Sequence, residues 1–233
     1  MFDFETLDIG TVFVGLSQQT LRGTSEAIEK KGYSRATIVV ARHDIAAKGY
    51  EYKYVASVSG RNFSELSLEL PNLDPGKYTA FAKFDWINIQ PPSYKATFSV
   101  YTPVRATLKK SSQTNHDKFL YKTFLDHARK NKKKQILNDS PEEWICSDFL
   151  INQGGYGYLA FHLDENSKRK IGVEIDEKDF ADKRLVLKRP YKGQGNIKTM
   201  VEPGKELIIL YRLKSQNYPT NMSLPNPKIY NLV

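Results

Sequence analysis

The single cysteine of the chain, Cys146, is the side chain whose type best suits nucleophilic catalysis. It lies in the segment Trp144–Asp148, and either His127 or His162 could act as its general base. No glycine or glutamine precedes it, and a lone cysteine among apolar neighbours usually serves as a small core residue. We therefore predict that Cys146 is not catalytic and that the protein is not an enzyme.

Metal ligation is the second kind of chemistry to weigh. Zinc sites need histidines or cysteines at short, regular spacings, which are not found among His43, His116, His127 and His162. Calcium needs about six to eight converging oxygens. The densest acidic run offers fewer, and lysines and an arginine interleave with it: Asp176, Glu177, Asp179 and Asp182. We predict a surface loop here, with no metal and no cofactor.

Clustered cations are the clearest candidates for binding. The chain carries a formal net charge of +9, which points to an acidic partner. The residues that we predict to contact this partner lie in two basic segments: Arg129, Lys130, Lys132, Lys133 and Lys134, and then Lys188, Arg189, Tyr191, Lys192 and Lys198. The structural alternative for the first segment is a solvated helix end, where cations complement the helix dipole.

The class of the acidic partner is narrowed by what the basic segments lack. Gly193 and Gly195 with flanking lysines suggest a phosphate loop, but the full Gly-x4-Gly-Lys-Ser/Thr pattern is absent. No RNP or OB-type motif accompanies the aromatic residues, which disfavours nucleic acid. An acidic protein surface such as tubulin is the expected partner, with anionic lipid as the alternative.

The elements that must position these residues are mostly strands. Thr11–Ser17, Ala36–Ala41, Tyr50–Val58, Leu66–Leu70, Lys77–Asp85 and Lys95–Tyr101 are apolar or alternating, and turn residues separate them. Such spacing predicts an antiparallel sandwich or barrel over residues 1–103. A basic helical linker is expected over residues 104–143, with Asp117–Gln135 helical because Leu120, Phe124 and Ala128 recur on one face.

A second β unit is expected over residues 144–213. Its strands are predicted at Tyr156–Leu163, Lys170–Ile175, Lys183–Leu187 and Glu206–Leu213. Residues 214–233 carry prolines and asparagines and are read as an extended C-terminal tail. The expected fold class is therefore mainly β, with two tandem antiparallel β-sandwich domains joined by a basic helical linker.

An internal repeat supports two units rather than one. Val58, Phe63, Leu68 and Leu70 stand at relative positions 0, 5, 10 and 12, and Asp74-Pro75-Gly76-Lys77 follows them. The same spacing recurs in Ile175, Phe180, Leu185 and Leu187, with Glu202-Pro203-Gly204-Lys205 farther on.

Several of these motifs resemble the non-catalytic β-sandwich of calpains, the third domain of the classical enzymes. The resemblance rests on Gly10–Gln18, Leu73–Thr79 and Phe98–Tyr101, and for the second unit on Gly155–Tyr158 and Val201–Gly204. It implies eight-stranded sandwiches like those of protist and ciliate calpain-like proteins that lack the protease core. The family's Gln-x-Gly-x-Cys-Trp motif is absent here, so the resemblance does not bring protease activity.

These observations lead to an expected function. We expect a non-catalytic structural or adaptor protein that binds an acidic assembly, with a cytoskeletal or axonemal, microtubule-associated setting. The alternative is a regulatory module of a calpain-like protease that responds to calcium or anionic lipid. No run approaches the ~20 apolar residues that span a bilayer, and no secretory signal is visible. A cytoplasmic location, with the cytoskeleton or cilium as its site, is expected.

Overall fold

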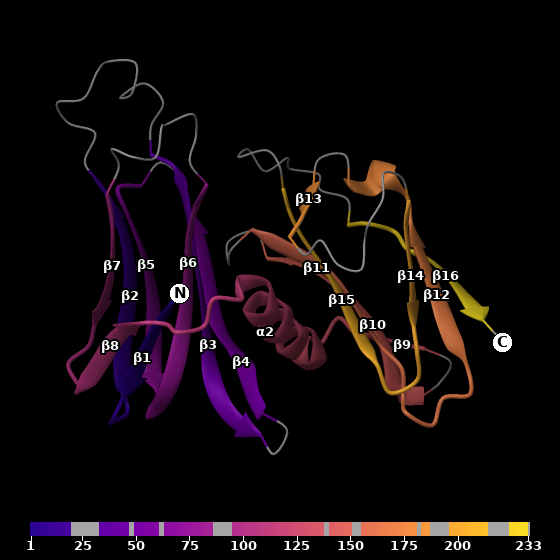
Figure 1. Ribbon diagram of the computed structural model, residues 1–233, viewed down its shortest axis with the longest axis horizontal. Helices are drawn as coiled ribbons and strands as arrows, with labels where there is room; N and C mark the ends of the chain where they lie inside the picture. Colours follow the sequence, from indigo (N-terminus) through magenta and orange to yellow (C-terminus); the bar gives the residue numbers. More distant parts are fainter. Residues whose placement is uncertain are drawn as a thin grey trace. The chain divides into compact units, whose positions relative to one another are not determined.

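The computed structural model is mainly β, which confirms the predicted class (Figure 1). It describes residues 1–19, 33–46, 49–60, 63–85, 95–137, 140–150, 155–180, 183–186, 196–213 and 224–232. The chain divides into two compact units. The first is Met1–His116 with residues 151–155, and the second is Asp117–Leu150 with Tyr156–Val233.

The first unit consists of two antiparallel sheets. Sheet A has the order β4-β3-β6-β1-β8, and its strands are β1 (Phe2–Thr6), β3 (Arg35–Ala46), β4 (Gly49–Gly60), β6 (Gly76–Asp85) and β8 (Ala106–Lys110). Sheet B has the order β5-β2-β7, with β2 (Gly10–Gln18), β5 (Glu65–Leu73) and β7 (Ala96–Tyr101).

Side chains from both sheets form one core in the first unit. Leu66, Leu68 and Leu70 of β5 are buried, whereas Glu65, Ser67 and Glu69 between them are exposed. This is the period of two expected of a strand with one apolar face. The same core cluster includes apolar residues of β1, β2, β3 and β6: Phe4, Val12, Val14, Leu16, Ile38, Val40, Tyr78 and Ala80.

The second unit also has a five-stranded and a three-stranded sheet. Sheet C has the order β13-β15-β11-β10-β9, with β9 (Gln135–Leu137), β10 (Ser140–Leu150), β11 (Tyr156–His162), β13 (Lys183–Leu185) and β15 (Glu206–Leu213). Sheet D has the order β14-β12-β16, with β12 (Lys170–Ile175), β14 (Ile197–Val201) and β16 (Lys228–Leu232). In the described ranges the remaining elements are helix α2 (His116–Lys130) and a short 3-10 helix, η2 (Glu177–Phe180).

Sheet C is covered on both of its faces. One face shares a core cluster with sheet D, to which Leu159, Phe161 and Ile209 contribute from sheet C. On the other face, the Phe124 ring of α2 lies 5.0 Å from the Tyr156 ring, centroid to centroid. Burial on both faces explains why all of β11 from Tyr156 to Phe161 is buried, without the alternation of β5.

The two units share one pairing scheme. In the first, β6 pairs with β1 and β3, and β2 pairs with β5 and β7. In the second, β15 pairs with β11 and β13, and β12 pairs with β14 and β16. Every pair is antiparallel, and the six strands of each scheme follow the same chain order. Strands β4 and β8 of the first unit and strands β9 and β10 of the second have no counterpart in that order. The topology of the six shared strands therefore repeats.

The predicted sequence repeat coincides with this topology only at its Pro-Gly turns. Each turn joins the edge strand of a three-stranded sheet to an inner strand of a five-stranded sheet, β5 to β6 and β14 to β15. Gly204 has φ 67°, a left-handed conformation that favours glycine. The apolar repeat positions do not correspond, because Val58 lies in β4 whereas Ile175 ends β12, the counterpart of β2.

The structure places several segments differently from the predicted boundaries. Strand β8 lies beyond residue 103 but pairs with β1, so it belongs to the first unit. Helix α2 ends at Lys130 rather than Gln135, and it packs on sheet C of the second unit. Part of the expected tail is strand β16, which pairs with β12; residues 214–223 lie outside the described part of the chain.

Glycines in sheets C and D provide a test of this packing. A Cβ on Gly157 would lie 2.2 Å from Cε2 of the fully buried Tyr211 and 2.5 Å from Cδ2 of Phe149. A Cβ on Gly172 would lie 2.2 Å from Cε2 of Tyr230, which is 43% exposed and free to swing outward. We expect Gly157→Ala to lower the free energy of unfolding by about 1–3 kcal/mol, and Gly172→Ala to cost clearly less. Urea unfolding of both variants measures the difference, and equal losses would contradict the packing.

Candidate functional site

The first predicted basic segment begins in the last turn of α2 and continues past its end, where the helix meets the outer face of sheet C. Cys146 and Asp148 of β10 lie opposite Ala160 and Tyr158 of β11 in the strand register. Their side chains share this face with Tyr158, whose ring centroid is 6.4 Å from that of Phe124. The helix end therefore lies over polar side chains of sheet C.

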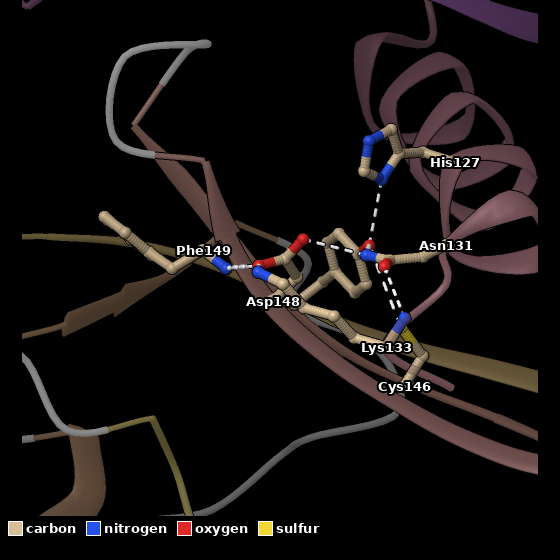
Figure 2. A network of polar contacts seen from close by, with 7 residues as sticks. His127, Asn131, Lys133, Cys146, Asp148 and Phe149 are labelled. Carbon is tan, nitrogen blue, oxygen red and sulfur yellow. Dashed lines mark hydrogen bonds and ion pairs between the residues drawn. The ribbon is translucent and has the colours of Figure 1, made fainter. Parts of the chain in front are cut away.

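The Tyr158 hydroxyl is the centre of a buried polar network, part of which is labelled in Figure 2. Asn131 Nδ2 donates to the Tyr158 oxygen at 2.9 Å, and His127 Nδ1 lies 2.9 Å from the same oxygen. Because Asn131 supplies a proton to this oxygen, the tyrosine proton is available to a neutral His127. Burial lowers the pKa of His127 and so favours this neutral form.

Asp148 anchors the segment that follows the helix. Its carboxylate accepts hydrogen bonds from Asn131 Nδ2 at 2.8 Å, Lys133 Nζ at 2.6 Å and the Phe149 backbone N–H at 2.9 Å (Figure 2). Burial by itself would raise the pKa of Asp148. The three hydrogen bonds outweigh burial and hold the pKa below its usual value, so the carboxylate is charged at neutral pH.

The surroundings of Cys146 are not those of an activated nucleophile. Its side chain is fully buried, and its recorded polar neighbour is the Tyr158 hydroxyl, 4.0 Å from Sγ. His127, the candidate base, is directed at the same hydroxyl. Burial raises the pKa of the Cys146 thiol, whereas nucleophilic cysteines are found where the pKa is lowered. The arrangement suits a small core residue.

Three of the five cations predicted at the helix end form ion pairs within the second unit. Arg129 pairs with Glu206 through both Nε and Nη2, and the Nε contact measures 2.7 Å. Lys130 Nζ lies 2.7 Å from Asp126 one helical turn earlier, and Lys133 pairs with Asp148. These three side chains tie the helix end to itself and to sheet C.

The other two cations of the segment have no carboxylate partner among the described residues. Lys134 Nζ donates to the Arg129 carbonyl at 2.6 Å and lies 5.4 Å from the Trp144 ring centroid. Lys132 is exposed, and no ion pair is recorded for it in the described part of the chain. Five cations and three carboxylates leave a net charge of +2, which Lys132 and Lys134 carry.

The second predicted basic segment is described only at its end. Lys198 lies on β14 and pairs with Glu174 of β12 at 3.5 Å, on a different sheet from the helix-end residues. The structure does not bring it together with Lys132 in any recorded contact. Lys188, Arg189, Tyr191 and Lys192 lie outside the described residues.

Neither histidines nor carboxylates gather at a metal-binding geometry in the described ranges, where no group of three or more such ligands is found. In the acidic run, Asp176 Oδ1 accepts the Lys178 backbone N–H and Asp179 Oδ2 accepts that of Asn226. These two carboxylates therefore accept hydrogen bonds from the backbone of loops. No helix in the described ranges has the length and apolarity to cross a bilayer.

Sequence reasoning did not single out Asn131, Tyr158 or Asp148. A usable indication existed for Asn131, because asparagine is common just after a helix. Its Oδ1 accepts the Lys133 backbone N–H at 2.9 Å, which starts the turn that leads into β9. The pairing of Asp148 with Tyr158 depends on strand register, which no local pattern contains.

Comparison with known proteins adds no relative: no family model, no curated protein and no solved structure matches the chain. The resemblance to the calpain sandwich therefore stays a prediction based on the quoted motifs.

The Asp148 carboxylate should make the stability of the second unit depend on pH. Its pKa is lower in the folded than in the unfolded state, so the unfolded state takes up the proton first as the pH falls. The stability from Asp148 is therefore complete above its ordinary pKa of about 3.9 and is lost as the pH falls through the folded-state pKa. We expect Asp148→Asn to lower the free energy of unfolding at pH 7 by about 1–3 kcal/mol and to flatten its dependence on pH below about 4.

Urea unfolding from pH 7 to pH 3 measures both effects. The control is Glu202→Gln, which breaks a pair with Lys170 in which both side chains are 50% exposed. We expect that control to change stability by less than about 1 kcal/mol at pH 7. Indistinguishable behaviour of the two variants would show that the network does not hold the helix end.

Proposed function

We propose that this chain is a non-catalytic structural adaptor, built from two β-sandwich units of calpain type, that binds an acidic protein assembly. The proposed assembly is a tubulin polymer of the cytoskeleton or cilium. The sandwich assignment is supported by the five-stranded and three-stranded sheets of each unit. In each unit the two sheets contribute side chains to a core of that unit. The shared pairing scheme supports a duplicated binding module.

The observation that carries the proposal is the positive charge held in place at the end of α2. The hydrogen bonds from Asn131 and Lys133 to Asp148 fix the backbone around Lys132, so this lysine is presented on an ordered segment. Electrostatic interactions are screened beyond about 8 Å at physiological salt, so a charge acts only on a surface that it contacts. An ordered, exposed lysine meets that requirement with little loss of backbone entropy.

The absence of an activated nucleophile at Cys146 favours binding over chemistry. The Cys146 thiol is buried and its pKa is raised, and His127 contacts the Tyr158 hydroxyl rather than the thiol. The polar residues near the basic segment thus serve to stabilise the fold. The exposed cations Lys132 and Lys134 are left to contact a partner.

Co-sedimentation with microtubules tests the proposal. We expect the protein to pellet with microtubules at low salt, and its affinity to fall as salt is raised because the contacts are ionic. Lys132→Ala should weaken binding about fivefold, which corresponds to roughly 1 kcal/mol per cation at an acidic surface. Lys77→Ala removes the same charge from an exposed position at the start of β6 in the first unit and should leave binding unchanged.

Vesicles that contain phosphatidylserine, with and without Ca²⁺, are measured in parallel. Failure to bind microtubules at any salt concentration, or binding to vesicles alone, would contradict the proposal. Vesicle binding that requires Ca²⁺ would favour the regulatory module instead.

A further inference from the structure

One edge of the second unit is open in the part of the chain that the structure describes. Ile229 of β16 lies opposite Val173 in the register of sheet D, so its side chain faces the same interior side. Val173 is fully buried, whereas Ile229 is 39% exposed. Because sheet D has three strands and sheet C has five, strands β10 and β9 extend past the point where the described part of sheet D ends at β16.

A groove of about 500 Å³ occupies this position. One side comes from sheet C, through Ile145, Ser147 and Leu159. The other side is the segment that leads into and begins β16: Leu224, Pro225, Asn226, Pro227 and Ile229. Lys133 and Gln135 complete the lining. Ser147 Oγ is shielded from solvent and has no hydrogen-bond partner among the described residues. The groove is thus mainly apolar, with one unsatisfied hydroxyl.

The corresponding corner of the first unit is crossed by the chain itself. Strand β7 holds the place of β16, and it continues through residues 102–105 into β8, which pairs with β1. In the second unit the strand beside β11 is β10, which precedes β11 in the chain and is not joined to β16. The second unit repeats the topology without a connection like that from β7 to β8, and its corner beside β16 is not crossed by the described part of the chain.

Strand β16 has the features of an edge that accepts another strand. Among the described residues it pairs with β12 alone, so its other side presents backbone N–H and C=O groups. The edge strand β8 of the first unit ends in Lys109 and Lys110, the kind of charge that protects an edge from pairing. In β16 the central residues are instead Ile229 and Tyr230, which are 39% and 43% exposed.

Lysines flank the groove on both sides. Lys133 lies in its lining, and its side chain is 68% exposed even though it pairs with Asp148. Lys228 begins β16 and is exposed, as is Lys132 before β9. An incoming strand with carboxylates at its outward positions would be complementary to these cations.

We propose that the β16 edge and this groove bind an extended acidic peptide, which adds to sheet D as a fourth strand. Its backbone pairs with β16, one apolar side chain enters the groove between Ile145 and Ile229, and its carboxylates face Lys132 and Lys228. This inference rests on the proposed acidic partner and specifies how part of that partner is held: as an extended segment rather than as a flat surface.

Fluorescence anisotropy with a short labelled peptide, in which glutamate alternates with valine, tests the inference on the full chain. We expect saturable binding that weakens with salt. N-methylation of the peptide at alternate residues along its pairing edge removes the backbone donors, and it should weaken binding about tenfold or more. Ile229→Glu should do the same by placing a charge at the groove. The matched variant Met200→Glu, at an exposed position of β14, should leave binding unchanged.

The outcomes separate this inference from the proposed function. Unchanged affinity of the N-methylated peptide overturns strand addition even if Ile229→Glu fails to fold, because that comparison uses the unaltered protein. Equal binding of a peptide with lysine in place of glutamate overturns the charge argument. A dimer in sedimentation that Ile229→Glu abolishes would assign the edge to a second copy and overturn the inference. If the protein binds microtubules but not the peptide, strand addition fails and the adaptor function stands. If it binds the peptide but not microtubules, strand addition stands and the adaptor function fails.

Discussion

Sheet C must be covered on both faces, and the rest of the second unit follows from that constraint. Every residue of β11 from Tyr156 to Phe161 is buried, so neither face of this strand is left to solvent. Sheet D covers one face, and helix α2 contributes Phe124 to the other. Burying large side chains in this way is worth about 1.5–3 kcal/mol each, far more than exposed ion pairs contribute. The helix is therefore a structural layer of the unit.

The position of the basic segment is a consequence of this layer. Where the helix ends, Asn131 turns the chain and binds both Tyr158 and Asp148. Ion pairs consume the charge of Arg129, Lys130 and Lys133, so the cations that make the segment recognisable in sequence mostly hold the fold together. What remains for a partner is a smaller excess of charge on an ordered segment. This differs from a flexible basic tail, which would lose more entropy on binding.

Local patterns predicted the elements with a clear period and missed those without one. Leu66, Leu68 and Leu70 alternate, and the helix stripe of Leu120, Phe124 and Ala128 is buried as its spacing indicates. Strand β10 was not predicted at all, and Pro141 and two glutamates interrupt the apolar character of its first half. The apolar stripe of α2 already implied a covering partner, but which sheet covers it depends on long-range packing. The same limit applies to the Asp148–Tyr158 pairing and to the groove beside β16.

Amide hydrogen exchange of the full chain, resolved by residue, tests the central claim that α2 is a layer of the second unit. If the helix covers sheet C, the amides from Leu120 to Ala128 should be protected to a similar degree as those of β11, because both exchange only when the unit opens. Exchange of these helix amides at nearly the rate of an unfolded chain, while β11 stays protected, would show that α2 is a separate linker and would contradict the account.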